Sequence, residues 1–207
     1  MDPEDIENLA VLDQAVGLDP QYCVDRPMVL SLEKQWSFSG QDHIIRDQDG
    51  KILMKSDGSA FEIDRDWISF TDNLDREIFR CLRIYPKSQF DVFVPHSLQK
   101  VFEIDLMFGM NHGGKGSAGS RTRFKDHLTG VDKEIVINWD TIARRRGMIY
   151  LRDDVGHEGR NEKMYGKGVP IGYLGDFDRG DDQRLELTPK IDYALVAITA
   201  ICSKYLN

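Results

Sequence analysis

The sequence predicts a mainly β protein: a closed antiparallel barrel of about twelve strands around a central, hydrophobic C-terminal helix. Two observations lead to this prediction. Short segments rich in β-branched and aromatic residues recur between Gly, Asp, Asn or Pro from residue 28 to residue 187. They leave almost no room for the crossover helices that a parallel sheet needs. A segment near the C-terminus is apolar on all sides when drawn as a helix, so it needs a covering.

The strand pattern appears in twelve short segments. They are residues 29–32, 36–38, 43–46, 51–55, 67–70, 77–84, 90–94, 98–108, 134–139, 148–152, 169–174 and 184–187. The stretches 43–53 and 68–79 repeat one arrangement of strand, Asp-rich turn and strand. Because Asp, Asn and Gly tolerate tightly turned backbone, the turns at residues 47–50 and 72–75 predict two successive hairpins.

The N-terminal segment is acidic. The first 20 residues contain six acids and no base, whereas the 207-residue chain has 35 acids, 27 bases and a net charge of −8. We expect residues 1–27 to form an acidic, mobile arm, with a short helix around residues 6–16. We expect residues 28–207 to form one barrel domain, which is then close to neutral. A near-neutral body argues against a protein that binds nucleic acid through bulk charge.

The C-terminal segment predicts a buried helix. Thr188 suits the N-cap and Pro189 suits the first helical position. From residue 191 to residue 202 only Asp192 and Thr199 are not apolar. The run is shorter than the ~20 apolar residues that span a bilayer, and it contains a carboxylate. Protein must therefore surround it, and a set of antiparallel strands that has to close provides the covering.

Several segments together resemble the LURP-one-related family, whose fold is shared with the tubby C-terminal domain and the phospholipid scramblases. The resemblance lies in residues 38–53, 67–72, 77–79, 169–173 and 185–195, and it covers most of residues 28–207. It implies a twelve-stranded barrel that encloses the last helix. The cysteine cluster and acidic calcium segment of the scramblases do not precede this helix, and residues 111–130 do not match the family pattern.

The Gly-rich stretch 109–120 contains two phosphate-binding patterns. Residues 109–116 lack the final Ser or Thr of a P-loop, and residues 114–119 match the G-x-G-x-x-G fingerprint. Both patterns need a helix directly after the loop. The following residues are too few and too basic for that helix, so we expect a flexible connection between strands. A nucleotide-binding enzyme that uses residues 109–119 stays open as an alternative.

Two groups of basic residues are candidate phosphate contacts. They are Lys115, Arg121, Arg123 and Lys125 in the first group, and Arg144, Arg145 and Arg146 in the second. Tubby-like domains bind phosphoinositide headgroups through basic side chains, so the resemblance implies this ligand class, and clustered Arg and Lys suit phosphate. Solvated surface charge is the competing interpretation of both groups.

Hydrolytic and metal chemistry find no support in the sequence. His157 begins a near match to H-E-x-x-H, but Asn161 stands where the second ligand belongs. The cysteines Cys23, Cys81 and Cys202 form no C-x-x-C pair. We expect no catalytic residues, no metal and no cofactor.

The combined prediction is a non-enzymatic binding or signalling module. The N-terminus lacks the basic and apolar regions of a secretory signal, so we expect an intracellular, cytoplasmic protein, peripheral to a membrane or nuclear. Expected partners are phosphoinositides, another anionic membrane surface, or proteins; nucleic acid and a membrane-spanning state are not expected. A protein-interaction scaffold whose acidic arm docks a basic partner is the second alternative.

Overall fold

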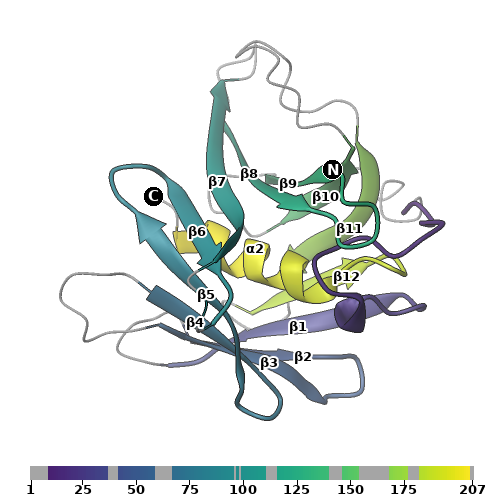
Figure 1. Cartoon of the computed structure of the whole chain (residues 1–207), viewed down its shortest axis with the longest axis horizontal. Coiled ribbons are helices and arrows are strands. Elements are labelled where there is room, and N and C mark those ends of the chain that lie inside the picture. The colour runs from purple at the N-terminus through teal and green to yellow at the C-terminus, as the bar shows by residue number, and fades with distance from the viewer. Residues whose placement is uncertain are drawn as a thin grey trace.

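Twelve antiparallel strands form a closed barrel around one helix (Figure 1). The computed structural model describes residues 9–36, 42–58, 67–95, 97, 99–110, 116–139, 146–153, 168–176 and 182–205. Each strand pairs with its neighbours in sequence, and the last strand pairs with the first, which closes the barrel. This architecture confirms the predicted fold class.

The strands follow one another as a continuous meander. They are β1 (Met28–Lys34), β2 (His43–Arg46), β3 (Ile52–Gly58), β4 (Trp67–Asp72), β5 (Glu77–Ile84), β6 (Gln89–Phe93), β7 (Lys100–Met110), β8 (Gly116–Lys125), β9 (Asp132–Trp139), β10 (Gly147–Arg152), β11 (Val169–Asp176) and β12 (Gln183–Leu187). A short 3₁₀ helix, η1 (Pro20–Tyr22), precedes them, and helix α2 (Tyr193–Tyr205) follows them.

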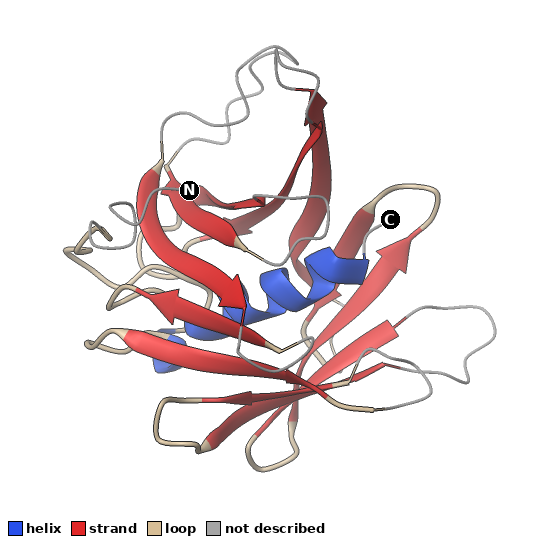
Figure 2. Ribbon diagram, turned by 180° about the vertical axis from the view of Figure 1, so that it is seen from behind, coloured by secondary structure: helices blue, strands red, loops and turns tan. Residues whose placement is uncertain are grey.

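Buried and partly exposed side chains alternate along the strands, and the buried ones form the core. In β1 the side chains of Leu30 and Leu32 point inward and are fully buried, while their neighbours are partly exposed. The register places Leu30 opposite Leu185 of β12, so both apolar faces point at the same interior. The interior is filled by α2, whose residues 194–203 are all buried (Figure 2). The predicted enclosure of the apolar helix is confirmed.

The up-and-down topology gives the barrel two distinct ends. Helix α2 begins beside residues 16–23, which precede β1, and we call this the strap end. The turns β2–β3, β4–β5, β6–β7 and β8–β9 share this end because consecutive strands alternate in direction. Helix α2 finishes at the other end, the distal end, where the ring of Tyr205 lies 6.1 Å from that of His43 at the start of β2. Strands β1, β5, β7 and β9 end there.

The two Asp-rich hairpin turns form as predicted. Asp47 accepts backbone hydrogen bonds from Asp49 and Lys51, and Asp72 accepts the equivalent bonds from Leu74 and Arg76. Each turn places one residue at positive φ, Gly50 at 77° and Asp75 at 60°. The repeated arrangement in the sequence therefore corresponds to two successive hairpins at the strap end.

Three local predictions were wrong. Trp36, expected to begin a strand, lies in none. The stretch 109–120, expected as a flexible connection, contains the end of β7 and residues 116–120 of strand β8, which continues to Lys125. The helix begins at Tyr193, and its N-cap is Asp192, which accepts a hydrogen bond from Leu195 N at 2.9 Å. Lys190 has a φ of 67°, which ends any helix that starts at Thr188. Residues 37 and 38 of the second predicted strand lie outside the described residues.

Candidate functional site

The N-terminal segment closes the strap end of the barrel. Residues 9–24, the N-terminal strap, run across the start of α2 and bond to it through the backbone. Val16 N donates to the carbonyl of Lys190 at 2.8 Å, and Asp192 N donates to that of Val16 at 2.9 Å. Only 3% of Val16 is exposed. The strap thus differs from the mobile arm expected from its composition, and its residues 9–16 form no helix.

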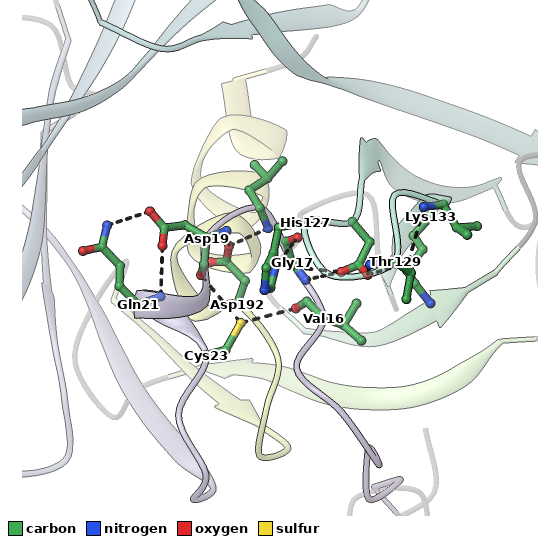
Figure 3. Close-up of polar contacts among 12 residues, drawn as sticks. Val16, Gly17, Asp19, Gln21, Cys23, His127, Thr129, Lys133 and Asp192 are labelled. Carbon is green, nitrogen blue, oxygen red and sulfur yellow. Dashed lines mark hydrogen bonds and ion pairs between the residues drawn. The ribbon is translucent and has the colours of Figure 1, made fainter.

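A buried carboxylate joins the strap to the helix (Figure 3). Asp192 accepts hydrogen bonds from the backbone N–H groups of Leu18 at 3.0 Å and Asp19 at 3.3 Å, in addition to the capping bond from Leu195. Its side chain is enclosed by the strap and the first turn of α2. Burial raises the pKa of Asp192 to about 6, although the three N–H donors act in the opposite direction.

A second carboxylate fastens the strap to the β8–β9 turn. Asp126 accepts hydrogen bonds from Gly17 N at 3.0 Å and from the hydroxyl of Thr129 at 2.6 Å. Burial alone would raise the pKa of Asp126, but these hydrogen bonds outweigh it and hold the pKa below its ordinary value. The next residue, His127, lies with its Nδ1 atom 2.9 Å from the carbonyl oxygen of Gly17. The hydrogen bonds of Asp126 and Asp192 at the strap end therefore hold the strap against the β8–β9 turn and the start of α2.

The thiols do not supply a nucleophile. Burial raises the pKa of Cys23 to about 12, and the nearby Asp192 and Asp126 carboxylates add to the effect. Burial likewise raises the pKa of Cys81 well above its ordinary value, and both Cys81 and Cys202 are inaccessible in the core. A thiol that stays protonated is a poor nucleophile. Cys81 and Cys202 pack in the core, and the Cys23 thiol donates to the carbonyl of Val16 at 3.7 Å within the strap.

Two of the predicted phosphate contacts lie on the outer wall of the barrel, in β8. Arg121 lies 3.2 Å from Asp105 of β7 and 3.3 Å from Glu134 of β9. Arg123 pairs with Glu103 at 2.7 Å and with Asp105. Carboxylates on the two neighbouring strands thus compensate both guanidinium groups. A phosphate group would have to compete with these carboxylates.

The other predicted contacts divide between the two ends. Lys125 is exposed at the strap end of β8, opposite Asp132. Arg146 precedes β10 at the distal end and pairs with Asp176 at 2.9 Å. Lys115, Arg144 and Arg145 lie outside the described residues. The strands on either side of them form two adjacent pairs, β7–β8 and β9–β10. The end of β7, the start of β8, the end of β9 and the start of β10 all lie at the distal end.

The structure removes the local basis for a nucleotide-binding loop. Gly109 belongs to β7, and Gly116 and Gly119 belong to β8. Both phosphate-binding patterns need a helix directly after the loop, and strand β8 stands at that place from residue 116 onward. Within the described parts of the chain, no three His, Cys, Asp or Glu side chains form a group that could hold a metal ion. The near match to H-E-x-x-H at residues 157–161 lies outside those parts.

Sequence reasoning missed an aromatic and basic group at the distal end. Trp36, just after β1, is 91% exposed, and Tyr85, just after β5, is 62% exposed. The guanidinium carbon of Arg83 lies 4.6 Å from the centre of the Tyr85 ring, and Lys87 is exposed in the same turn. The sequence pattern that could have identified this group is Tyr-Pro-Lys in the turn between two strands.

These observations define a class: a closed, twelve-stranded antiparallel barrel whose interior is occupied by its own C-terminal helix. Comparison with protein families identifies the family. The family described as LURP-one-related matches residues 28–204, which is most of the chain, so the protein belongs to the LURP-one-related family. The match begins at the first residue of β1 and leaves out the N-terminal strap. Comparison with curated proteins finds no match.

In the part of the chain that the structure describes, no helix has both the length and the apolar character needed to traverse a bilayer.

Proposed function

We propose that this protein is a non-enzymatic binding or signalling module that contacts phosphoinositide headgroups at an anionic membrane surface. Membership of the LURP-one-related family supports the general type, because its barrel is of the tubby-like kind. The interior is occupied by α2, so the outer wall and the connections are the surfaces on which a large ligand can bind. The activity expected from this arrangement is recognition.

The observation that carries the proposal is the shared position of two basic connections. Lys115 belongs to the β7–β8 connection, and Arg144, Arg145 and Arg146 belong to the β9–β10 connection. These hairpins are neighbours in the barrel, and the described strand ends that flank both connections lie at the distal end. Phosphate groups are bound well where several basic side chains approach from separate loops.

Arg121, Arg123 and Lys125 have a lesser part in this proposal. The two arginines are compensated by carboxylates on the wall, and Lys125 lies at the strap end. We expect them to contribute to the general attraction toward an anionic surface, which falls with salt. Lys115 and the three consecutive arginines are expected to contact the headgroup directly.

Vesicle flotation tests the proposal. The full chain is mixed with phosphatidylcholine vesicles with and without phosphoinositide, at low and high salt. Arg144→Ala with Arg145→Ala removes two charges at the distal end while it keeps the Arg146–Asp176 ion pair. At about 1 kcal/mol per basic residue near the surface, the double variant is expected to lose roughly 30-fold in affinity.

A matched double variant gives the control. Arg26→Ala with Lys51→Ala also removes two charges, but from the strap end, where Arg26 makes only an exposed ion pair with Asp49 at 3.9 Å. Flotation of this control is expected to match that of the wild type. Equal flotation of the wild type and the Arg144 and Arg145 variant would overturn the assignment of those residues.

A further inference from the structure

Two large aromatic side chains at the distal end are exposed to solvent. Trp36 follows β1 and Tyr85 follows β5, and both strands run from the strap end to the distal end. The other tryptophans behave differently, since Trp139 is buried in the core and Trp67 is half-buried on the wall beside Phe93. Figure 1 shows the β5–β6 hairpin projecting from the barrel near the end of α2. Tyr85 thus lies on a protruding turn.

The surroundings of Tyr85 are basic. The segment from residue 80 to residue 89 contains Arg80, Arg83 and Lys87 and no acidic residue. Arg83 stacks on the Tyr85 ring, and Lys87 is exposed two residues further along. We call Arg83, Tyr85, Pro86 and Lys87 the β5–β6 tip. It combines an aromatic ring that has a polar hydroxyl with two positive charges.

This combination matches the boundary between lipid headgroups and acyl chains. Trp and Tyr have an apolar ring and a polar group, so they partition to that boundary. Basic residues beside them are attracted by anionic lipids. Trp36 follows β1 and Tyr85 follows β5, and strands β2, β3 and β4 lie between β1 and β5 in the barrel, so the two aromatic groups are separate. Two separate aromatic groups can each enter a fluid lipid surface.

We propose that the distal end rests on an anionic bilayer, with Tyr85 and Trp36 in the interfacial layer and Arg83 and Lys87 against the headgroups. The proposal rests on the proposed membrane function, but it assigns different residues and a different property of the lipid, namely general negative charge together with aromatic insertion. The strap then faces away from the membrane, because it closes the opposite end.

Fluorescence of Trp36 provides the direct test. The full chain is titrated with phosphatidylcholine vesicles that contain phosphatidylserine, with and without phosphoinositide, and with lipids brominated near the headgroup. Because Trp36 is exposed, its emission is expected to shift to the blue and to be quenched on binding. The Trp36→Phe variant is expected to lose most of that change, because Trp139 is buried in the core. Trp67→Phe removes the half-buried tryptophan at the distal end of β4 and is expected to keep the change.

Substitutions at the β5–β6 tip distinguish the contribution of charge to vesicle binding from that of aromatic insertion. Lys87→Ala is expected to weaken binding to phosphatidylserine vesicles about fivefold, and Tyr85→Ala to weaken it by a comparable factor at both low and high salt. Leu74→Ala is the matched control, since Leu74 is 66% exposed in the β4–β5 turn at the strap end. Its binding is expected to equal that of the wild type. Circular dichroism and melting curves confirm that each exposed variant is folded.

The outcomes distinguish the two proposals. Binding that depends on phosphoinositide without quenching of Trp36 would overturn the aromatic insertion and leave the proposed function standing. Quenching of Trp36 that is identical with and without phosphoinositide would support the insertion and overturn the headgroup preference. Equal losses for Tyr85→Ala and Leu74→Ala, or no binding to any vesicle, would overturn the insertion.

Discussion

At the scale of single residues, Asp192 connects helix α2 to the N-terminal strap. Its carboxylate caps α2 at Leu195, and it also accepts two backbone hydrogen bonds from the strap, at Leu18 and Asp19. Its backbone N–H binds Val16. One side chain therefore specifies where the helix begins and where the strap lies. An aspartate is suited to this role because its two oxygens accept hydrogen bonds from different directions.

The buried position of Asp192 predicts a pH dependence of stability. Its pKa rises from the ordinary value of 3.8 to about 6 in the folded chain, so the folded state holds the proton more tightly than the unfolded state. This contribution is fully present below about pH 3.8 and is lost as the pH rises through 6. It amounts to roughly 3 kcal/mol between those limits. Urea unfolding of the wild type and of Asp192→Asn from pH 4 to pH 8 measures it.

The comparison with the variant isolates this residue from other carboxyl groups. Asp72 and Asp126 have lowered pKa values, since hydrogen bonds outweigh their burial, and they weaken the folded state in acid instead. Both remain in Asp192→Asn, so the difference between the two proteins is expected to carry the Asp192 contribution alone. A difference that stays constant across the pH range would contradict the assignment.

Gly17 predicts a second effect at this scale. A Cβ atom added there would lie 2.1 Å from the Cβ of Asp192, so Gly17→Ala requires the strap to move. We expect a loss of about 1–3 kcal/mol in the free energy of unfolding. Gly50→Ala is the control, because a Cβ at Gly50 has no neighbour within 4 Å although its φ of 77° is unfavourable. A larger loss at Gly17 measures the clash, and equal losses would argue against tight packing of the strap.

At the scale of elements, helix α2 depends on the barrel for its existence. Its few polar side chains are satisfied internally: Thr199 donates to the carbonyl of Leu195 at 2.8 Å, and Ser203 donates to that of Thr199. The Thr199 hydroxyl also lies 2.8 Å from that of Thr122 in β8. Because Thr199 uses its proton on Leu195, Thr122 is the donor in this pair. The Thr122–Thr199 pair is thus a polar contact between the wall and the helix.

The Thr122–Thr199 contact predicts a measurable coupling. Thr199→Val leaves the buried Thr122 hydroxyl without this acceptor, and we expect a loss of about 1–3 kcal/mol in unfolding free energy. The double variant Thr122→Val with Thr199→Val removes both hydroxyl groups and is expected to be more stable than the sum of the single losses implies. Chemical unfolding of all four proteins gives the coupling energy, expected at roughly 1 kcal/mol. Strictly additive losses would mean that the contact contributes nothing.

Enclosure of the helix predicts a severe effect of charge in its middle. Ala197 is fully buried, and Ala197→Asp introduces a carboxylate for which the surrounding apolar residues provide no partner. The expected cost is at least several kcal/mol. Leu74→Asp places the same side chain on an exposed turn and is expected to change stability by less than about 1 kcal/mol. The melting temperatures of the two variants test these expectations. A melting temperature of Ala197→Asp close to that of the wild type would contradict the burial of the helix.

At the scale of the whole molecule, the barrel is a meander closed by its first and last strands, with the strap at one end. Closure leaves no free sheet edge, and the helix supplies the interior of the cylinder. The family match begins at β1, whereas the hydrogen-bonded structure begins at least as early as Ala10, whose N–H donates to the carbonyl of Pro170. The folded unit therefore extends beyond the region that defines the family.

We expect amide hydrogen exchange to differ between the enclosed helix α2 and the N-terminal strap. Amides of α2 between residues 196 and 203 can exchange only when the barrel opens, so we expect their protection to equal the free energy of global unfolding. Amides of the strap at Ala10 and Val16 hold single hydrogen bonds near the surface, and we expect them to exchange through local opening. Mass spectrometry of peptic fragments resolves the two regions. Free exchange within α2 would contradict its position inside the barrel.

Strand β8 shows why part of the wall escaped prediction. Its inward side chains include Ser120 and Thr122, which are fully buried although they are polar. Thr122 points at Thr199 of α2, so the hydrophobic alternation that marks other strands is absent here. The Gly residues of the stretch strengthened the expectation of a loop. The predicted number of about twelve strands nevertheless agrees with the closed barrel.

The candidate site was predicted only as a set of residue types. Basic residues 121–125 are close in sequence, yet β8 places Arg121 and Arg123 on the wall and Lys125 at its strap end. Their partners Glu103, Asp105 and Glu134 come from the two neighbouring strands. Charge along the sequence does not reveal such pairing, since it depends on the register of strands.

The sequence alone determined the all-antiparallel fold class, the buried C-terminal helix and the hairpin turns, because each depends on local periodicity or on the backbone preferences of neighbouring residues. Only the tertiary structure decided the path of the strap, the start of the helix and the division of charges between wall and ends. The strap bonds to residues more than 100 positions away, as in Gly17 to Asp126 and Leu18 to Asp192. Contacts at such separation leave no local pattern, because they form only when closure of the barrel brings the two segments together.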